Sequence, residues 1–185
     1  MNAISLPRRS LAAAAVVGGL GLRAATAATA GELQSKAAQA LATLRRVRPD
    51  SVRMLEKAAA TLVFPEVVKG GLLVGGQYGE GVLHVGEALR GYYRIAAASF
   101  GLQAGAQSFS LAMLFMNQAA LAYLDRSEGW QLGAGPSFVV ADEAFARQIT
   151  STTLTQDVVA YIFGQQGLMG GIGIEGAKIM RFTPG

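Results

Sequence analysis

Apolar residues recur every three or four positions after residue 30, which predicts an amphipathic helix over 31–48. Polar and charged residues fall between them, and Pro49 ends the helix. A similar period predicts a second helix over 51–64, with Asp50 as its N-cap and Pro65 at its end. The apolar rows that should face a core are Leu33, Ala37, Leu41, Leu44 and Val47, then Val52, Leu55, Ala59 and Leu62.

The pattern changes after Pro65, where short glycine-rich segments with β-branched and aromatic residues predict strands. These segments are 71–78, 81–86, 91–99, 102–116, 130–140, 157–166 and 168–182. A short helix capped by Asn117 is predicted at 117–127, and 142–149 is either another short helix or a loop. Most strands have no long crossover helix between them, so the sheet should be mainly antiparallel. The predicted fold class is α+β: N-terminal helices followed by a strongly curved, Gly-rich, mainly antiparallel β-sheet.

The glycine-rich stretch 63–86 has three interpretations: a phosphate loop, a flexible linker or a curved hairpin. A phosphate loop ends in Gly-Lys-Ser/Thr, whereas Lys69 precedes the glycines here. A flexible linker would not carry interspersed Leu, Val and Tyr. The stretch therefore predicts a curved hairpin, with a tight turn or bulge at Gln77 and Tyr78. Gly70 should have positive φ where the chain reverses into the first strand.

The first thirty residues have the features of an export signal. A pair of arginines at 8–9 precedes an apolar stretch over 11–22, which is shorter than the roughly 20 residues that span a bilayer. The small residues at 28–30 fit a cleavage site. The arginine pair is typical of twin-arginine signals, while the general secretory route and an N-terminal membrane anchor stay open. We expect residues 1–30 to be removed and 31–185 to form one domain, periplasmic or secreted.

Removing residues 1–30 takes away most of the basic charge. The sequence has 16 Lys+Arg and 12 Asp+Glu, and three of the arginines lie in the first thirty residues. The balance over 31–185 is therefore +1, and nucleic-acid binding loses its main support. Residues 31–70 carry +3 and residues 71–185 carry −2, so attraction to anions should lie in 31–70.

Catalytic chemistry finds little support in the sequence. The absence of cysteine excludes disulfides, thiolate nucleophiles and a lipoprotein anchor. His84, the sole histidine, lies in an apolar predicted strand, where a packing or surface role is more typical than a general base. The glycines of 171–176 match G-x-G-x-x-G without the helix and the distant acidic residue that dinucleotide binding requires. We expect no enzyme, no cofactor, and no catalytic or metal-binding residues. A hydrolase assembled across the fold is a third-ranked alternative.

Four segments together resemble the SYLF domain family. They are FPEVVKGG at 64–71, GGQYGEG at 75–81, QAGAQ at 103–107 and GLMGGIGIEGAKI at 167–179. The resemblance covers nearly all of 31–185. It implies a single non-enzymatic, lipid-binding domain, which in eukaryotes is also described as an actin-binding module.

The resemblance further implies binding of anionic phospholipids, notably phosphoinositides, through a basic amphipathic N-terminal helix. By position the corresponding segment is 31–69, and its candidate lipid contacts are Lys36, Arg45, Arg46, Arg48, Arg53, Lys57 and Lys69. The expected partner is an anionic membrane surface and not nucleic acid, and export makes actin an unexpected partner. Three alternatives stay open: the arginines only solvate a helix face, the sheet face holds the ligand, or the domain is an envelope assembly module that binds a protein.

Overall fold

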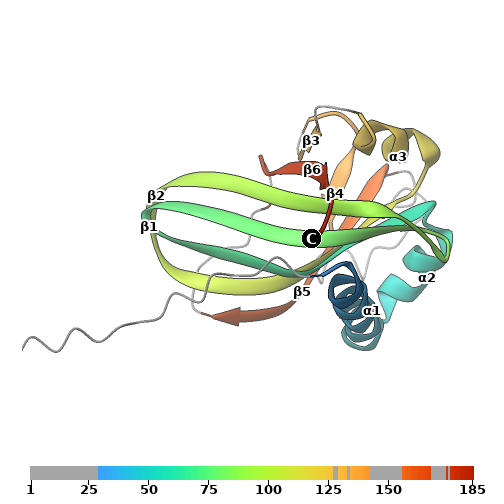
Figure 1. Ribbon diagram of the computed structural model, residues 1–185, viewed down its shortest axis with the longest axis horizontal. Helices are drawn as coiled ribbons and strands as arrows, with labels where there is room; N and C mark the ends of the chain where they lie inside the picture. Colours follow the sequence, from blue (N-terminus) through green and yellow to red (C-terminus); the bar gives the residue numbers. More distant parts are fainter. Residues whose placement is uncertain (1–28, 127–128, 133, 142–155, 168–173, 175) are drawn as a thin grey trace, which may run out of the picture.

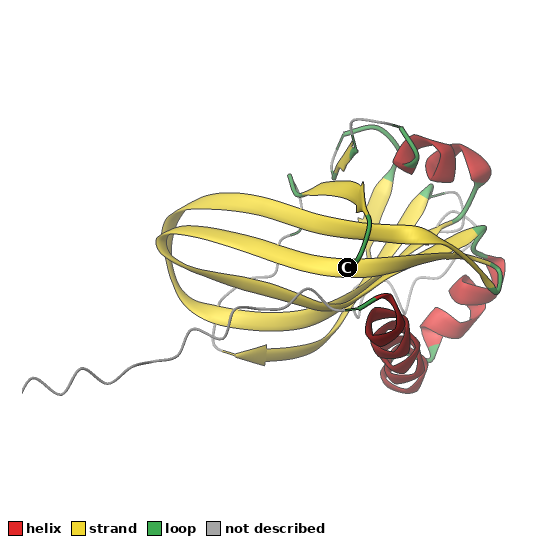
Figure 2. Ribbon diagram, in the orientation of Figure 1, coloured by secondary structure: helices red, strands yellow, loops and turns green. Residues whose placement is uncertain are grey.

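The computed structural model describes residues 29–126, 129–132, 134–141, 156–167, 174 and 176–185. Two helices come first, α1 (Ala30–Val47) and α2 (Asp50–Lys57), and two very long strands follow, β1 (Ala60–Val85) and β2 (Ala88–Phe115). The later elements are α3 (Gln118–Leu124), β3 (Trp130–Gln131), β4 (Phe138–Val140), β5 (Val158–Gly167) and β6 (Lys178–Phe182). Figure 2 shows the helices beside a strongly curled sheet. The predicted α+β fold class is confirmed.

β1 and β2 form one antiparallel hairpin on which the rest of the sheet is built. Its register runs from Ala60 opposite Phe115 to Val85 opposite Ala88, and Gly86, with φ 58°, lies in the turn. β5 pairs with the second half of β2 and β6 with its first half, both antiparallel. Beyond them, β4 pairs with β5 in parallel and β3 pairs with β6.

The hairpin bends back on itself, so that the two halves of β1 come into contact (Figure 1). A Cβ atom added at Gly81 would lie 2.6 Å from the Val63 carbonyl oxygen and 2.6 Å from Cδ1 of Phe64. One added at Gly79 would lie 2.8 Å from a backbone oxygen of the first half. Glycine is therefore required for this approach. We call this contact, between 63–67 and 79–82, the seam.

α1 and α2 cover one face of the sheet at the seam. The buried row of α1 packs against Val63 and Val82, and Met54 of α2 joins the same cluster. That row consists of Leu33, Ala37, Ala40 and Leu44. Its spacing of three and four residues explains why this segment is a helix and which side faces the sheet.

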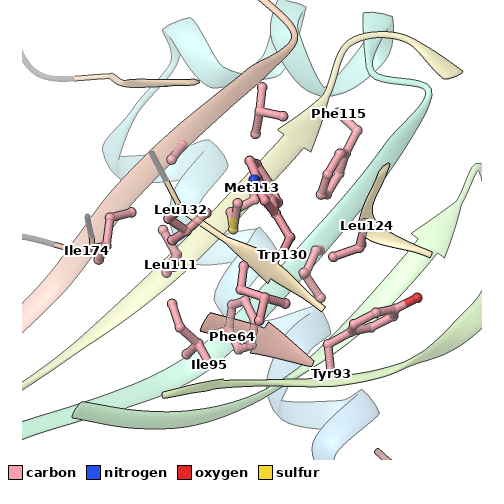
Figure 3. Packing of buried hydrophobic residues seen from close by; sticks show 14 of the residues in the cluster. Phe64, Tyr93, Ile95, Leu111, Met113, Phe115, Leu124, Trp130, Leu132 and Ile174 are labelled. Carbon is pink, nitrogen blue, oxygen red and sulfur yellow. The ribbon is translucent and has the colours of Figure 1, made fainter. Parts of the chain in front are cut away.

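The concave side of the sheet holds a second core. Trp130 lies among Met113, Phe115 and Leu132 in Figure 3, and its ring centroid is 5.9 Å from that of Phe115. Tyr93 lies at the edge of this cluster with its hydroxyl group pointing away from it (Figure 3). α3, β3 and β6 close this side, opposite α1 and α2 in Figure 1.

The second helix is shorter than the sequence predicts. α2 ends at Lys57, and residues 60–64 form the start of β1, paired with 111–115. Strand pairing is favoured there because alternate side chains enter two cores. Leu62 and Phe64 pack in the core on the concave side, and Val63 packs in the core under α1 and α2. Asp50 is the first residue of α2 and not its N-cap.

Pro65 lies inside β1 and does not end a helix. The register shifts between Phe64 and Val67, so Pro65 lies at a bulge, a position that proline tolerates in a sheet because it has no N–H to donate. Its carbonyl oxygen accepts a hydrogen bond of 2.7 Å from Ser110 Oγ. The bulge therefore adapts the strand to the proline.

The predicted turn at Gln77 and Tyr78 is wrong, because both residues lie inside β1. Segments 71–78 and 81–86 belong to one strand, and 91–99 and 102–116 to another. The predicted reversal at Gly70 is also wrong, since Gly70 pairs with Ala106 and its φ is not positive. The glycines bend a continuous strand and allow the seam to form.

Several local predictions are confirmed. Asn117 caps α3, accepting a 2.8 Å hydrogen bond from the Ala120 N–H, and the strand predicted at 157–166 is β5. The segment 130–140 contains two short strands with different partners. Segments 142–149 and 1–28, and most of 168–175, lie outside the described residues.

Candidate functional site

The solvent-facing sides of α1 and α2 carry most of the predicted lipid contacts. Because the buried row of α1 faces the sheet, its remaining positions point into solvent. We call the exposed residues of the two helices the helix surface. Its cations are Lys36, Arg45, Arg46, Arg53 and Lys57, and it also exposes Val47 and Val52.

The two valines depart from the sequence prediction, which placed them on apolar rows facing the core. Val47 is 49% exposed and Val52 is 37% exposed. The burial of α1 stops at Leu44, one turn before the helix ends. Two apolar side chains thus stand in solvent among cations, an arrangement typical of helices that lie in a membrane interface.

A groove of about 620 Å³ lies beside Val52, between the two helices and the turn end of β1. Leu41, Leu55 and Val52 give it an apolar lining, and Arg45 and Glu56 also border it. His84 lines the groove from β1. Partial burial lowers the pKa of His84, so its imidazole is neutral near pH 7. The groove can hold hydrocarbon next to one cation.

Arg48 is different, because its guanidinium group is held by internal contacts. It donates to both carboxylate oxygens of Asp50, at 3.0 and 2.9 Å, and to the Ala141 carbonyl oxygen at 2.8 Å. It also lies 5.1 Å from the ring centroid of Tyr161, and burial raises the pKa of that phenol. Arg48 thus connects the loop between the helices to the sheet.

Lys36 and Lys69 lie apart from the other candidates. Lys36 is on the first half of α1, beside a polar hollow of about 290 Å³ that also contains Glu66 and Gln166. Lys69 is half-buried in β1 opposite Gln107. The structure therefore gathers Arg45, Arg46, Arg53 and Lys57 on the last turn of α1 and on α2, and separates the other three.

Comparison with protein families identifies the relatives of this domain. Residues 96–183 match the family Ysc84, described as Las17-binding protein actin regulator. Residues 96–183 are consistent with a domain of the SYLF (Ysc84) family. This is a family of binding domains that is known for lipid and actin binding, and it is not a known enzyme family. A comparison with curated proteins gave no match.

The SYLF match begins inside β2 and covers α3 and β3 to β6. It is narrower than the resemblance drawn from the sequence, and it leaves the helix surface outside. Within the residues that the structure describes, no helix is long and apolar enough to cross a bilayer. No cluster of three or more His, Asp or Glu in the same residues could hold a metal ion.

The sequence did not indicate the groove or the role of His84 in lining it. The groove joins α1, α2 and a strand end about thirty residues further along the chain, and no local pattern shows that contact. The exposed valines have a weak signal in hindsight, because they are the outermost positions of their apolar rows next to Pro49.

Proposed function

We propose that this SYLF domain binds anionic phospholipid surfaces through the helix surface, by binding alone and without catalysis. The observation that carries the proposal is the exposure of Val47 and Val52 among four cations beside an apolar groove. Each Lys or Arg near an anionic membrane contributes about 1 kcal/mol of attraction. The valines would enter the interface while the cations meet lipid phosphates. The match of residues 96–183 to a family known for lipid binding supports the proposal.

Vesicle flotation tests the proposal. The variant Arg45→Gln/Arg46→Gln/Arg53→Gln should lose about 3 kcal/mol of binding to anionic vesicles at low salt, on about 1 kcal/mol per residue. That is a loss of roughly a hundredfold in affinity. The salt dependence should also flatten, because exposed charges are screened over about 10 Å at 0.1 M. Arg48 is left intact so that its internal contacts do not confuse the result.

A second variant separates insertion from simple charge attraction. Val47→Ser/Val52→Ser keeps every cation and removes apolar surface. It should weaken vesicle binding about tenfold, since partial burial of two valines is worth on the order of 1–2 kcal/mol. If both variants bind anionic vesicles as well as the unaltered chain, the helix surface is not the lipid site, and a protein partner becomes the better hypothesis.

Headgroup preference belongs to the same proposal. Phosphoinositide headgroups carry several phosphate charges, and four cations of the helix surface, Arg45, Arg46, Arg53 and Lys57, suit them. Vesicles with phosphatidylserine and with a phosphoinositide, matched in total charge, distinguish a phosphate preference from charge attraction. Equal binding to both would contradict the preference.

We also propose that residues 1–30 direct export, so that the domain acts in the periplasm or outside the cell, where actin is absent. Mass spectrometry of exported protein should show a chain that begins at Gly31. Replacing the arginines at 8–9 with lysines should block export by a twin-arginine route.

In the structure Thr29 caps α1, accepting from the Glu32 N–H at 3.3 Å and donating to Glu32 Oε2 at 3.0 Å. Cleavage after Ala30 would remove this cap.

A further inference from the structure

A second group of cations borders a cavity beside β6, lined by residues other than those of the helix surface. The cavity has a volume of about 610 Å³ and lies between β2, β6 and the segment after α3. Its cations are Arg94, Arg126, Lys178 and Arg181, all exposed, and Tyr93 and Asp125 also line it. We call it the β6 cavity. In Figure 1, β6 and α3 lie above the hairpin while α1 and α2 lie below it.

Aromatic rings hold three of these guanidinium groups in place. Arg126 lies 4.5 Å from the ring centroid of Tyr123, Arg94 lies 5.5 Å from that of Phe182, and Arg181 lies 5.5 Å from that of Tyr93. A guanidinium stacked on a ring is fixed in position and keeps its N–H groups free in the plane. Stacking therefore orients the donors before any ligand arrives.

Among the residues that the structure describes, fewer negative than positive charges lie near the cavity. Asp125 accepts a 2.8 Å hydrogen bond from the Tyr93 hydroxyl and lies 3.6 Å from Nη2 of both Arg90 and Arg181. Glu80 is opposite Arg94 in the ladder and accepts from the Tyr78 hydroxyl. Among the described residues, two carboxylates thus face five cations.

Among the described residues, no carboxylate pairs with the remaining donors. In the described part of the chain, no hydrogen bond or ion pair joins Arg94, Arg126 or Lys178 to an acidic side chain. Exposed cations gathered at one hollow repel one another, and a multivalent anion relieves that repulsion. The cluster is better matched to a ligand than to a structural role.

We infer that the β6 cavity binds a phosphate group carried by a small molecule or a lipid headgroup. Guanidinium groups pair bidentately with phosphate oxygens, and a nearby lysine adds a point charge. The cavity volume is within the roughly 300–1,000 Å³ that small-ligand sites occupy. Arg126, Lys178 and Arg181 lie within the residues that match the family, Tyr93 and Arg94 lie just before them, and the helix surface lies wholly outside. The inference is therefore independent of the function proposed above.

Calorimetric titration of the full chain with sodium pyrophosphate tests the inference. The cavity variant Arg94→Gln/Arg126→Gln/Lys178→Gln should bind at least about tenfold more weakly, which corresponds to the loss of about 1.4 kcal/mol. The matched control is Arg45→Gln/Arg46→Gln/Arg53→Gln, which removes three arginines from the helix surface and should bind pyrophosphate like the unaltered chain. Circular dichroism checks folding, and Lys178→Gln alone serves if the triple variant does not fold.

Vesicles distinguish the two sources of the phosphate. Phosphatidylcholine vesicles that contain phosphatidylinositol 4-phosphate are compared with pyrophosphate in solution. Weaker pyrophosphate binding by the cavity variant, with the control variant unchanged, supports the inference for a phosphate in solution. Weaker vesicle binding by the cavity variant than by the unaltered chain supports it for a lipid headgroup; the control variant is not used with vesicles, because the function proposed above already predicts that it binds them weakly. If the unaltered chain binds neither probe, or the folded cavity variant binds both as well as the unaltered chain, the inference is wrong. Because the control variant alone tests the helix surface, one proposal can fail without the other.

Discussion

The helix surface and the β6 cavity are both rich in cations, yet they are built differently. The cations of the helix surface come from one short stretch, 36–57, and stand in solvent beside exposed valines. Those of the β6 cavity come from β2, the segment after α3, and β6, and three of them stack on aromatic rings. One surface is convex and partly apolar, and the other is a hollow with fixed donors.

This difference indicates different ligands. A membrane presents many headgroups at variable positions, so mobile side chains on a helix can meet them without a defined geometry. A single phosphate group gains most from donors that are already oriented, because less conformational entropy is lost on binding. Arginine is therefore suited to a membrane surface when it is mobile on a helix, and to a single phosphate group when its donors are already oriented in a cavity.

The seam connects the two regions. α1 packs on Val63 and Val82 of the seam, while the second half of β1 supports the part of β2 that pairs with β6. A change at the seam should therefore disturb both regions, whereas changes within either region should leave the other intact.

The largest effect is expected from Gly81→Val. Its Cβ would lie 2.6 Å from the Val63 carbonyl oxygen and from Cδ1 of Phe64, so the two halves of β1 must separate. We expect a loss of about 3 kcal/mol in the free energy of unfolding, at the upper end for overpacking. Urea denaturation measures it, and vesicle and pyrophosphate binding should weaken together.

Gly70→Ala is a control at a β1 glycine outside the seam. A Cβ at Gly70 would lie 3.7 Å from the Gly105 carbonyl oxygen, an ordinary contact, and Gly70 has extended backbone geometry. Stability should change by less than about 1 kcal/mol. Equal destabilisation by both substitutions would show that strand curvature, and not the seam, requires the glycines.

Arg48→Gln should have the next largest effect. It removes the paired hydrogen bonds to Asp50 and the bond to the Ala141 carbonyl oxygen. We expect a loss of about 2 kcal/mol in unfolding free energy, since hydrogen bonds to charged groups contribute about 1.5–3 kcal/mol. Arg46→Gln, which changes an exposed arginine, should stay within about 0.5 kcal/mol. Thermal unfolding compares them, and equal melting temperatures would remove the structural role of Arg48.

The sequence predicts those elements whose signals are local. The period of α1, the Asn117 cap of α3 and the apolar run of β5 each reside in one short stretch, and all three were predicted. The continuous β1 was missed, because its glycines resemble turn residues and only the seam shows why they are needed. Residues 58–64 look helical until their strand partners are known.

Charge counting failed for a similar reason. Residues 71–185 sum to −2, which directed attention to 31–70. Five cations of that acidic part nevertheless gather at one end of the sheet, around the β6 cavity, because β2 and β6 are neighbours and the segment after α3 lies beside them. Net charge along a chain says little about charge in space when residues about eighty positions apart come together.

Asp125→Asn tests how the carboxylate in the β6 cavity affects anion binding there. The substitution removes the carboxylate that lies 3.6 Å from Arg181 and keeps an oxygen that can accept from the Tyr93 hydroxyl. Pyrophosphate binding should tighten about fivefold, because one exposed charge at about 4 Å is worth roughly 1 kcal/mol in water. Calorimetry measures this. Weaker binding would mean that Asp125 positions Arg181 more than it opposes the ligand.

The smallest effect concerns His84, which lines the groove with Arg45 and Glu56. Burial lowers the pKa of His84 from 6.5, so the unfolded chain takes up a proton that the folded chain accepts less readily. This group therefore contributes its full stability above about pH 6.5, and the contribution falls as the pH drops through the lowered folded pKa. When the pH is lowered from about 7.5 to about 5.5, the free energy of unfolding should fall less for the His84→Gln variant than for the unaltered chain.

Urea denaturation across that range measures the His84 effect in isolation. His84 is the sole histidine in the sequence, and the lowered pKa values of Glu32 and Asp157 place their titration below 4.5 and 3.8. A parallel loss of stability in both proteins would show that burial in the groove does not hold His84 neutral. A smaller loss in the variant would identify His84 as a group through which acid lowers the stability of the fold.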